Sequence, residues 1–292
     1  MMTTLENFDF EGIIPISDDE FRKISEIVFS RFGINLTDKK KILVQARLSK
    51  VIRKMGLSSF DQYYNEVIND KTSKSLLLLI DHITTNYTYF FREKIHFSFF
   101  RDNILLTINR MLQSNNEKPA LRIWVAGCAT GEEAYTLGIL LYESFAGRLQ
   151  NIDIGILATD ISLTSLKEAK RGLYSDIKLA ELPADFRLKY FDKIAGNQYR
   201  IKEKIKKLVL FKRFNLMNKI FPFKRKFHII FCRNVMIYFR QESRKELIDN
   251  FFNSMYPEAY LFIGHSETLG MENAKFRFVK AGIYQKILPI ES

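Results

Sequence analysis

The sequence has few cysteines and no long apolar run, and each shortage excludes a class of protein. Two cysteines among 292 residues, Cys128 and Cys232, are too few for a disulfide framework, so reduced thiols are expected. The densest apolar run, Leu76 to Ile80, spans five residues, whereas about 20 are needed to cross a bilayer. Residues 1–11 carry acids and no basic stretch ahead of an apolar one. We therefore expect a cytoplasmic chain with no membrane insertion and no secretory signal.

Acidic residues are also scarce relative to basic ones. The chain holds 45 Lys and Arg against 33 Asp and Glu, a net charge of +12, which favours acidic partners. The excess is concentrated in residues 22–54, with ten basic residues against two acids, and in residues 200–226, with eleven against one. Each stretch is either a solvated face or a docking surface, and composition alone does not choose between them.

Residues 18–86 show a helical pattern. Ser17 followed by Glu20 is typical of a capping box at a helix start. A second helix is predicted over residues 37–56, with an apolar stripe beside a basic one. The apolar stripe consists of Val44, Leu48, Val51 and Met55, and the basic stripe of Lys40, Arg47, Lys50 and Lys54. A further helix is expected over residues 73–84.

After Pro119 the pattern changes to strands that alternate with helices, which predicts an α/β fold with a mostly parallel, doubly wound sheet. The expected strands cover residues 121–126, 152–158, 227–232 and 259–264, with an edge hairpin over 276–287. Residues 198–202 and 208–213 resemble short strands outside this alternation, and we interpret them as a small β insertion at about residues 192–214. The predicted domains are residues 1–88 and 89–292.

A glycine turn follows the first predicted strand of the sheet. Gly127 and Gly131 would let the backbone approach a ligand closely, and a helix N-terminus follows. The spacing matches neither the dinucleotide motif nor the phosphate-binding P-loop. Glu132 and Glu133 would repel a phosphate at this point and suit hydroxyls or positive charge. The alternative is a tight strand–helix connection without a ligand.

Asp160 ends the next predicted strand. An acid at this place in a nucleotide-binding βαβ unit accepts hydrogen bonds from ribose hydroxyls. The alternative is a helix cap, a role open to Asp160 or Ser162. With the glycine turn, Asp160 favours an adenosine-bearing cofactor held without a bound phosphate. S-adenosylmethionine fits, because it combines a ribose, an adenine and a cationic sulfonium.

Two further segments carry polar residues in places where ligands bind. Arg233 follows a buried strand, where open α/β sheets bind ligands and where an unused charge is costly. Residues 85–93 mix polar residues with four aromatics at the junction of the two regions. The alternative for that segment is interdomain packing.

These segments together closely resemble the CheR family of chemoreceptor glutamate methyltransferases. The matching motifs are TNYTYFFRE at 85–93, GEEAY at 131–135, ATDI at 158–161, FNL at 214–216, FCRNVMIYF at 231–239 and GHSE at 264–267. The resemblance implies a Rossmann-like class I S-adenosylmethionine-dependent methyltransferase fold, with a small all-helical N-terminal domain and a small antiparallel β insertion.

The resemblance also implies roles for the matching residues. Arg92 and Tyr238 are the implied catalytic pair beside the transferred methyl group. The implied cofactor-binding residues are Asn86, Thr88, Arg92, Glu133, Asp160, Asn215, Leu216, Cys232 and Arg233, and the sequence does not separate Glu133 from Glu132. The implied reaction turns a receptor glutamate into its methyl ester and releases S-adenosylhomocysteine, with no metal.

The implied chemistry suits the residues present. A glutamate with a reference pKa of about 4.3 is already ionised at neutral pH, so alignment and water exclusion matter more than a general base. The stripe of Lys40, Arg47, Lys50 and Lys54 would dock on the acidic helical bundle of a methyl-accepting chemoreceptor. The stretch 192–201 looks shorter than in family members that grip a receptor tether peptide, so independence of a tether is expected.

Two rival functions stay open. A nucleic-acid methyltransferase would suit the net charge of +12, although no zinc cluster or RNA-binding aromatic motif is present. A non-catalytic module that binds the cofactor or only docks receptors is the other. The four histidines, His82, His96, His228 and His265, show no metal-ligand spacing and are interpreted as packing or surface residues. We expect a monomer without a nucleic-acid partner.

Overall fold

The computed structural model describes residues 12–108, 120–145, 147–270 and 273–287. The chain divides into two compact units, Met1–Thr85 and Asn86–Ser292. This division falls three residues before the boundary predicted at residue 88. Among the described residues, no helix is both long enough and apolar enough to cross a membrane.

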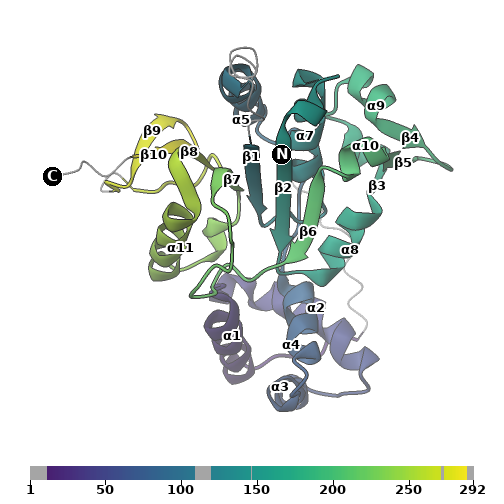
Figure 1. Ribbon diagram of the computed structural model, residues 1–292. Helices are drawn as coiled ribbons and strands as arrows, with labels where there is room; N and C mark the ends of the chain where they lie inside the picture. Colours follow the sequence, from purple (N-terminus) through teal and green to yellow (C-terminus); the bar gives the residue numbers. More distant parts are fainter. Residues whose placement is uncertain (1–11, 109–119, 146, 271–272, 288–292) are drawn as a thin grey trace. The chain divides into compact units, whose positions relative to one another are not determined.

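The first unit is helical (Figure 1). Its elements are α1 (Asp18–Phe32), η1 (Asp38–Lys40), α2 (Lys41–Lys54), α3 (Phe60–Asn69) and α4 (Lys74–Ile83). The predicted capping box starts α1, since Ser17 Oγ accepts from Glu20 N at 3.2 Å and Glu20 Oε2 accepts from Ser17 N at 2.8 Å.

The core of the first unit takes one face from each of its longer helices. Its buried members include Val28, Val44, Leu48, Ile52, Phe60, Tyr63, Leu79 and Ile80. Met55, the last member of the predicted apolar stripe, lies outside this core, because it follows the last turn of α2 and is 37% exposed.

The second unit is built on a seven-stranded sheet in the described residues. Its strands are β1 (Ala120–Ala126), β2 (Asp153–Asp160), β6 (Val209–Arg213), β7 (Phe227–Cys232), β8 (Met255–Ile263), β9 (Phe276–Lys280) and β10 (Ile283–Lys286). The order is β6-β2-β1-β7-β8-β10-β9, with the first five strands parallel and β10 antiparallel to both neighbours. The Rossmann-like, doubly wound sheet is therefore confirmed.

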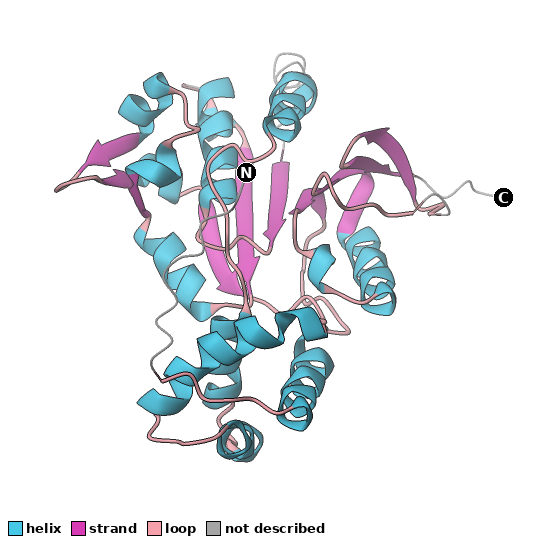
Figure 2. Cartoon of the chain, turned by 180° about the vertical axis from the view of Figure 1, so that it is seen from behind, coloured by secondary structure: helices cyan, strands magenta, loops and turns pink. Residues whose placement is uncertain are grey.

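Helices and irregular turns connect these strands and cover the sheet (Figure 2). They are α5 (Lys94–Phe99), η2 (Phe100–Leu105), α7 (Glu132–Ser144), η3 (Leu149–Asn151), α8 (Leu163–Arg171), η4 (Asp176–Leu179), α9 (Ala184–Tyr190), α10 (Glu203–Lys206), η5 (Met236–Tyr238) and α11 (Gln241–Ser254). Both α7 and α8 pack on β2 and β6.

Successive side chains of β1 point to opposite faces of the sheet, and each face has its own core. Ile123 and Val125 join the main cluster that includes the apolar face of α7. Trp124 points to the opposite face, where its ring contacts five phenylalanines, among them Phe251 of α11. The Trp124 Nε1–H donates to Thr159 Oγ1 at 2.8 Å, so the indole is satisfied where it is buried. Burial on both faces explains why residues 123–126 of this strand are all apolar.

A second, small antiparallel sheet lies outside the main one (Figure 1). It consists of β3 (Leu173–Ser175), β4 (Phe191–Lys193) and β5 (Gln198–Ile201), in the order β3-β5-β4. The prediction that residues 208–213 also belong to this insertion was wrong. Val209–Arg213 is β6, which pairs in parallel with β2 at the edge of the main sheet. Its short length and exposed basic residues are those of an edge strand.

Candidate active site

The predicted site residues follow strands whose carboxyl ends lie along one edge of the parallel sheet. Backbone hydrogen bonds connect these ends. Gly127 N and Cys128 N, after β1, donate to Thr159 O of β2 at 2.8 and 2.9 Å. Phe214 N, after β6, donates to Asp160 O at 3.1 Å. This edge is where open α/β sheets bind ligands.

The turn after β1 requires its glycines. Gly127 has φ +81°, and a Cβ there would lie 2.4 Å from Val235 Cγ2. Gly131 has φ +94° and is the N-cap of α7. The turn therefore brings bare backbone to the sheet edge, as the glycine spacing predicted.

Asp160 ties two loops of this edge together. Its Oδ2 accepts from Ala129 N at 2.8 Å and its Oδ1 accepts from Ser162 N at 2.9 Å. The N-cap of α8 is Ser162, whose Oγ accepts from Ser165 N at 3.1 Å. Of the two residues considered as the helix cap, Ser162 therefore takes this role and Asp160 does not. A carboxylate oxygen can accept more than one hydrogen bond, and a ligand hydroxyl would use that property at Asp160.

Arg233 is the most heavily bonded cation of the site. Its Nη1 donates to Glu133 Oε2 at 2.6 Å and its Nη2 to Glu93 Oε2 at 3.0 Å. Nη2 also donates to the carbonyl oxygen of Arg92. The side chain is 1% exposed, and its Nε has no hydrogen-bond partner among the described residues. A buried cation with one free donor is suited to an anionic or polar ligand group.

The charges around Arg233 set the pKa values of the two acids. Burial raises the pKa of Glu133, and the Arg233 guanidinium opposes that rise. Burial also acts to raise the pKa of Glu93, but the charge of Arg233 and hydrogen bonds from Arg233 and Asn234 lower it overall. Glu93 is therefore held as a carboxylate beside the guanidinium.

Glu132 and Glu133 have different partners. Glu132 is fully buried, accepts from Thr130 Oγ1 and pairs with Lys178 Nζ at 2.9 Å. The same Lys178 Nζ donates to Thr88 O at 2.7 Å, which ties Thr88 to α7. Glu132 is thus engaged with Lys178, whereas Glu133 is turned to Arg233. The geometry favours Glu133 as the acid that faces a ligand.

The other predicted residues lie around this network. Asn86 Nδ2 donates to Ser165 Oγ at 2.6 Å, and Arg92 Nη1 donates to Tyr87 O at 2.8 Å. Asn215 Oδ1 accepts from Met217 N at 3.0 Å, in the loop after β6. Leu216 is buried in the same loop, Cys232 is buried at the end of β7, and Tyr238 is half-buried at the end of η5.

Both cysteines are poor nucleophiles. Burial raises the pKa of the Cys128 and Cys232 thiols well above the ordinary value, and nearby carboxylates add to the rise. They stay protonated at neutral pH, because the thiolate is the form that burial disfavours.

Sequence reasoning assigned no role to Glu93, Glu267 or Lys178. Glu267 accepts from Asn234 N at 2.9 Å, Gly264 N at 2.5 Å and Ile237 N at 3.1 Å, so it clamps the loop that carries Tyr238 to the end of β8. Glu93 and Glu267 each end one of the motifs that carry the family resemblance, and this was the sequence signal that could have pointed to them. Nothing in the sequence around Lys178 indicated its contact with Glu132.

The basic stripe of the first unit is not uniform. Lys50 and Lys54 are exposed. Arg47 Nη1 instead donates to Ile83 O at 2.7 Å and Thr84 O at 3.1 Å, which caps the end of α4. Burial lowers the pKa of Lys40, and the charge of Arg47 lowers it further. Arg47 therefore has a role within its own unit.

Comparison with known proteins assigns both units. Residues 19–84 match the family model described as the CheR methyltransferase all-alpha domain, and residues 86–285 match the CheR methyltransferase SAM binding domain. The chemotaxis protein methyltransferase of Borreliella burgdorferi is 40% identical over 285 residues, 98% of this chain and 100% of that protein. Those of Vibrio anguillarum and Escherichia coli are 33% and 31% identical, over 94% and 93% of this chain and 98% and 92% of theirs.

Proposed function

Because the chain belongs to the CheR methyltransferase family, we propose that it methylates glutamate side chains of methyl-accepting chemoreceptors, using S-adenosylmethionine and releasing S-adenosylhomocysteine. The observation that carries this proposal is the buried Arg233, held between Glu133 and Glu93 at the sheet edge that also carries Asp160. Arg233 offsets one of the two carboxylates, so the cluster keeps a negative charge that suits a sulfonium and an ammonium group, while Arg233 itself suits the carboxylate of the same cofactor.

The residues at this edge fit S-adenosylmethionine. Asp160 would accept from ribose hydroxyls, and Arg233 Nε is a buried donor without a partner among the described residues. Glu133 would meet the ammonium end, with Asn86, Thr88, Arg92 and Cys232 around the methionine part. Asn215 and Leu216 would flank the adenine. When bound, S-adenosylmethionine supplies a methyl group activated by its positively charged sulfur.

The chain's own contribution to the reaction is positioning. The receptor glutamate arrives ionised, so no side chain has to remove a proton from it. Arg92 would orient the incoming carboxylate with a charge-assisted hydrogen bond, and Tyr238 would hold it through the phenol. Excluding water from that carboxylate and aligning it with the methyl group supply the rate enhancement.

Receptor docking falls to the exposed part of the basic stripe. Lys50 and Lys54 present two positive charges on one face of α2, and receptor signalling bundles are rich in glutamate. Surface charges of this kind chiefly speed encounter and set orientation. We further propose a cytoplasmic monomer that acts without a receptor tether peptide and has no nucleic-acid partner.

The test uses the purified protein, tritiated S-adenosylmethionine and one of three acceptors: receptor-bearing membranes, tRNA or DNA. Base-released volatile methanol measures carboxyl methyl esters. The proposal predicts methanol release from receptor membranes and no filter-retained label on nucleic acid. Label on tRNA or DNA would instead support a nucleic-acid methyltransferase. No label anywhere, with cofactor binding shown by calorimetry, would support a non-catalytic module.

A further inference from the structure

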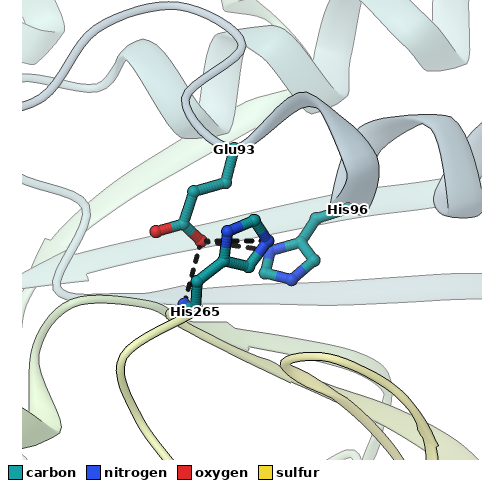
Figure 3. Close-up of side chains that lie close together, drawn as sticks. All are labelled: Glu93, His96 and His265. Atoms are coloured by element: carbon teal, nitrogen blue, oxygen red, sulfur yellow. Dashed lines mark hydrogen bonds and ion pairs between the residues drawn. The ribbon is translucent and has the colours of Figure 1, made fainter.

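Three potential metal ligands meet beside the Arg233 network, and two of them, both histidines, have no role in the proposed reaction (Figure 3). They are Glu93 from the segment before α5, His96 from the first turn of α5 and His265 from the loop after β8. One ligand atom from each residue lies within 4.8 Å of the other two. The His96 and His265 rings lie edge to face, with their centroids 4.6 Å apart.

The tautomer of His96 is fixed by the backbone. Its Nε2 lies 3.0 Å from the carbonyl oxygen of Ala281. A carbonyl only accepts, so Nε2 carries the hydrogen and Nδ1 of the neutral ring keeps a bare lone pair. Histidine ligands of metals have this arrangement, in which the second ring nitrogen donates to a carbonyl or carboxylate.

The lone pair of His96 Nδ1 has no satisfactory partner among the described groups. The side chain is 0% exposed, and Nδ1 makes no hydrogen bond. Its nearest ionic neighbour is Glu93 Oε2 at 3.4 Å, an acceptor that already receives Arg233 Nη2 at 3.0 Å and His265 N at 3.3 Å. The buried lone pair of His96 Nδ1 therefore faces another acceptor, and a cation between the two atoms would satisfy it.

The backbone holds His96 in this place. Gly282 has φ +71°, and a Cβ there would lie 2.6 Å from His96 Nε2. Glycine thus allows the turn between β9 and β10 to close on the ring and bring Ala281 O to it. The edge of His96 also packs on Phe262, with ring centroids 5.8 Å apart. The imidazole is locked with Nδ1 directed at Glu93.

We propose that Glu93 Oε2, His96 Nδ1 and His265 Nε2 bind a zinc ion, with the fourth position open to water. Tetrahedral zinc with nitrogen and oxygen ligands places ligand atoms about 3.3 Å apart. The distance from Glu93 Oε2 to His96 Nδ1 is 3.4 Å, and from Glu93 Oε2 to His265 Nε2 it is 4.0 Å. All three ligand atoms lie within 4.8 Å of one another, so the His265 ring would have to turn toward the other two to complete the site. Its side chain is 44% exposed, which leaves room for that turn and lets solvent reach the ion.

The proposed ion would stand beside a guanidinium that two carboxylates flank. Glu93 also accepts from Arg233, so the ion shares its carboxylate with a guanidinium. The other side of that guanidinium is neutralised by Glu133. Two imidazoles with one carboxylate form a ligand set that zinc uses in proteins. The ion would fix the segment of Arg92 and Glu93 to the loop after β8. It would thereby also hold the carbonyl oxygen of Arg92, which accepts a hydrogen bond from Arg233.

The experiment uses the full chain, stripped with a chelator, and zinc ions alone as the probe. Zinc content is measured by elemental mass spectrometry after dialysis, and affinity by competition with a chromophoric chelator. His265→Ala tests the site at an exposed ligand, His96→Gln tests the buried one, and His82→Ala is the control for an exposed histidine outside the cluster. Cobalt substitution reports the geometry through its visible absorption.

We expect one zinc ion per chain in the wild type and in His82→Ala. His265→Ala should bind zinc at least about 10-fold more weakly, since even the loss of a ligand's hydrogen-bonding partner costs that much. Zinc should raise the Tm of the wild type but not of His265→Ala. Equal zinc content in His265→Ala and wild type, or no zinc above background in the wild type, would overturn the proposal. None of these readouts depends on methyltransferase activity.

Discussion

Arg233 Nη1 donates to Glu133 Oε2 at 2.6 Å, although the two residues stand 100 positions apart in the chain. The bond joins the end of β7 to the first turn of α7, and Glu93 holds the other side of the same guanidinium. The carboxyl edge of the sheet is thus assembled around one buried cation. Three segments far apart in the sequence meet there, which places the proposed methionine-binding residues together.

Replacing Glu133 should weaken cofactor binding more than replacing its neighbour Glu132 does. Glu133→Gln keeps the shape but removes the charge, so calorimetry should show roughly 10-fold weaker S-adenosylmethionine binding. Unfolding free energy should fall by about 1–3 kcal/mol, because Arg233 loses a buried partner. Glu132→Gln is the control, since it removes the neighbouring acid, which is fully buried and pairs with Lys178. Equal loss of cofactor affinity in both variants would contradict the assignment of Glu133.

The turn after β1 should not tolerate a side chain. In Gly127→Ala, φ +81° and a Cβ 2.4 Å from Val235 Cγ2 should together lower the free energy of unfolding by about 2 kcal/mol or more. Val235→Ala removes the clash but not the backbone strain. Urea unfolding of both single variants and the double variant should therefore give a favourable coupling of about 1 kcal/mol. Strictly additive changes in the free energy of unfolding would show that the clash with Val235 does not cause the loss of stability.

Charge reversal on α2 should weaken receptor methylation alone. Lys50→Glu with Lys54→Glu should lower the methylation rate on receptor membranes severalfold, more so at low salt, and leave cofactor affinity unchanged. Lys71→Glu with Lys74→Glu makes the same charge change on exposed lysines of the same unit. If both pairs slow methylation equally, a general charge effect accounts for the result.

Arg47→Glu should instead lower the Tm, since Arg47 caps α4.

The loop before α4 should stabilise the first unit in a pH-dependent way. Hydrogen bonds from Ser75 and Thr72 hold the pKa of Asp70 well below its ordinary value. A lowered pKa gives stability that is full above the unfolded-state pKa, near 4, and is lost as pH falls below it. The Tm difference between wild type and Asp70→Asn should therefore shrink between pH 7 and pH 3.5. A constant difference would assign the effect to hydrogen bonding without ionisation.

Local signals in the sequence predicted most elements correctly. The pair Ser17 and Glu20 marked the start of α1, and alternation of strands and helices marked the parallel sheet, because both patterns depend on neighbours in the chain. β6 was misplaced because a short edge strand with basic residues has the same local pattern as a hairpin strand. Only its pairing with β2, more than 40 residues away, distinguishes the two.

The site shows the same division between local and long-range information. The glycine turn and Asp160 were predicted from their places at strand ends. The bond between Lys178 and Glu132 and the capping of α4 by Arg47 join residues distant in the sequence, so no local pattern predicts them. His96 and His265 were interpreted as packing or surface residues because their spacing in the chain hides that they meet in the fold.

The most direct test of the account is to locate the methyl group. Receptor membranes incubated with the purified protein and S-adenosylmethionine are digested and analysed by tandem mass spectrometry. The account predicts new methyl groups on glutamate side chains, absent when Arg92→Ala replaces the wild type and removed by mild base. Methyl groups on lysine, arginine or cysteine, or none on a receptor that the protein demonstrably binds, would contradict it.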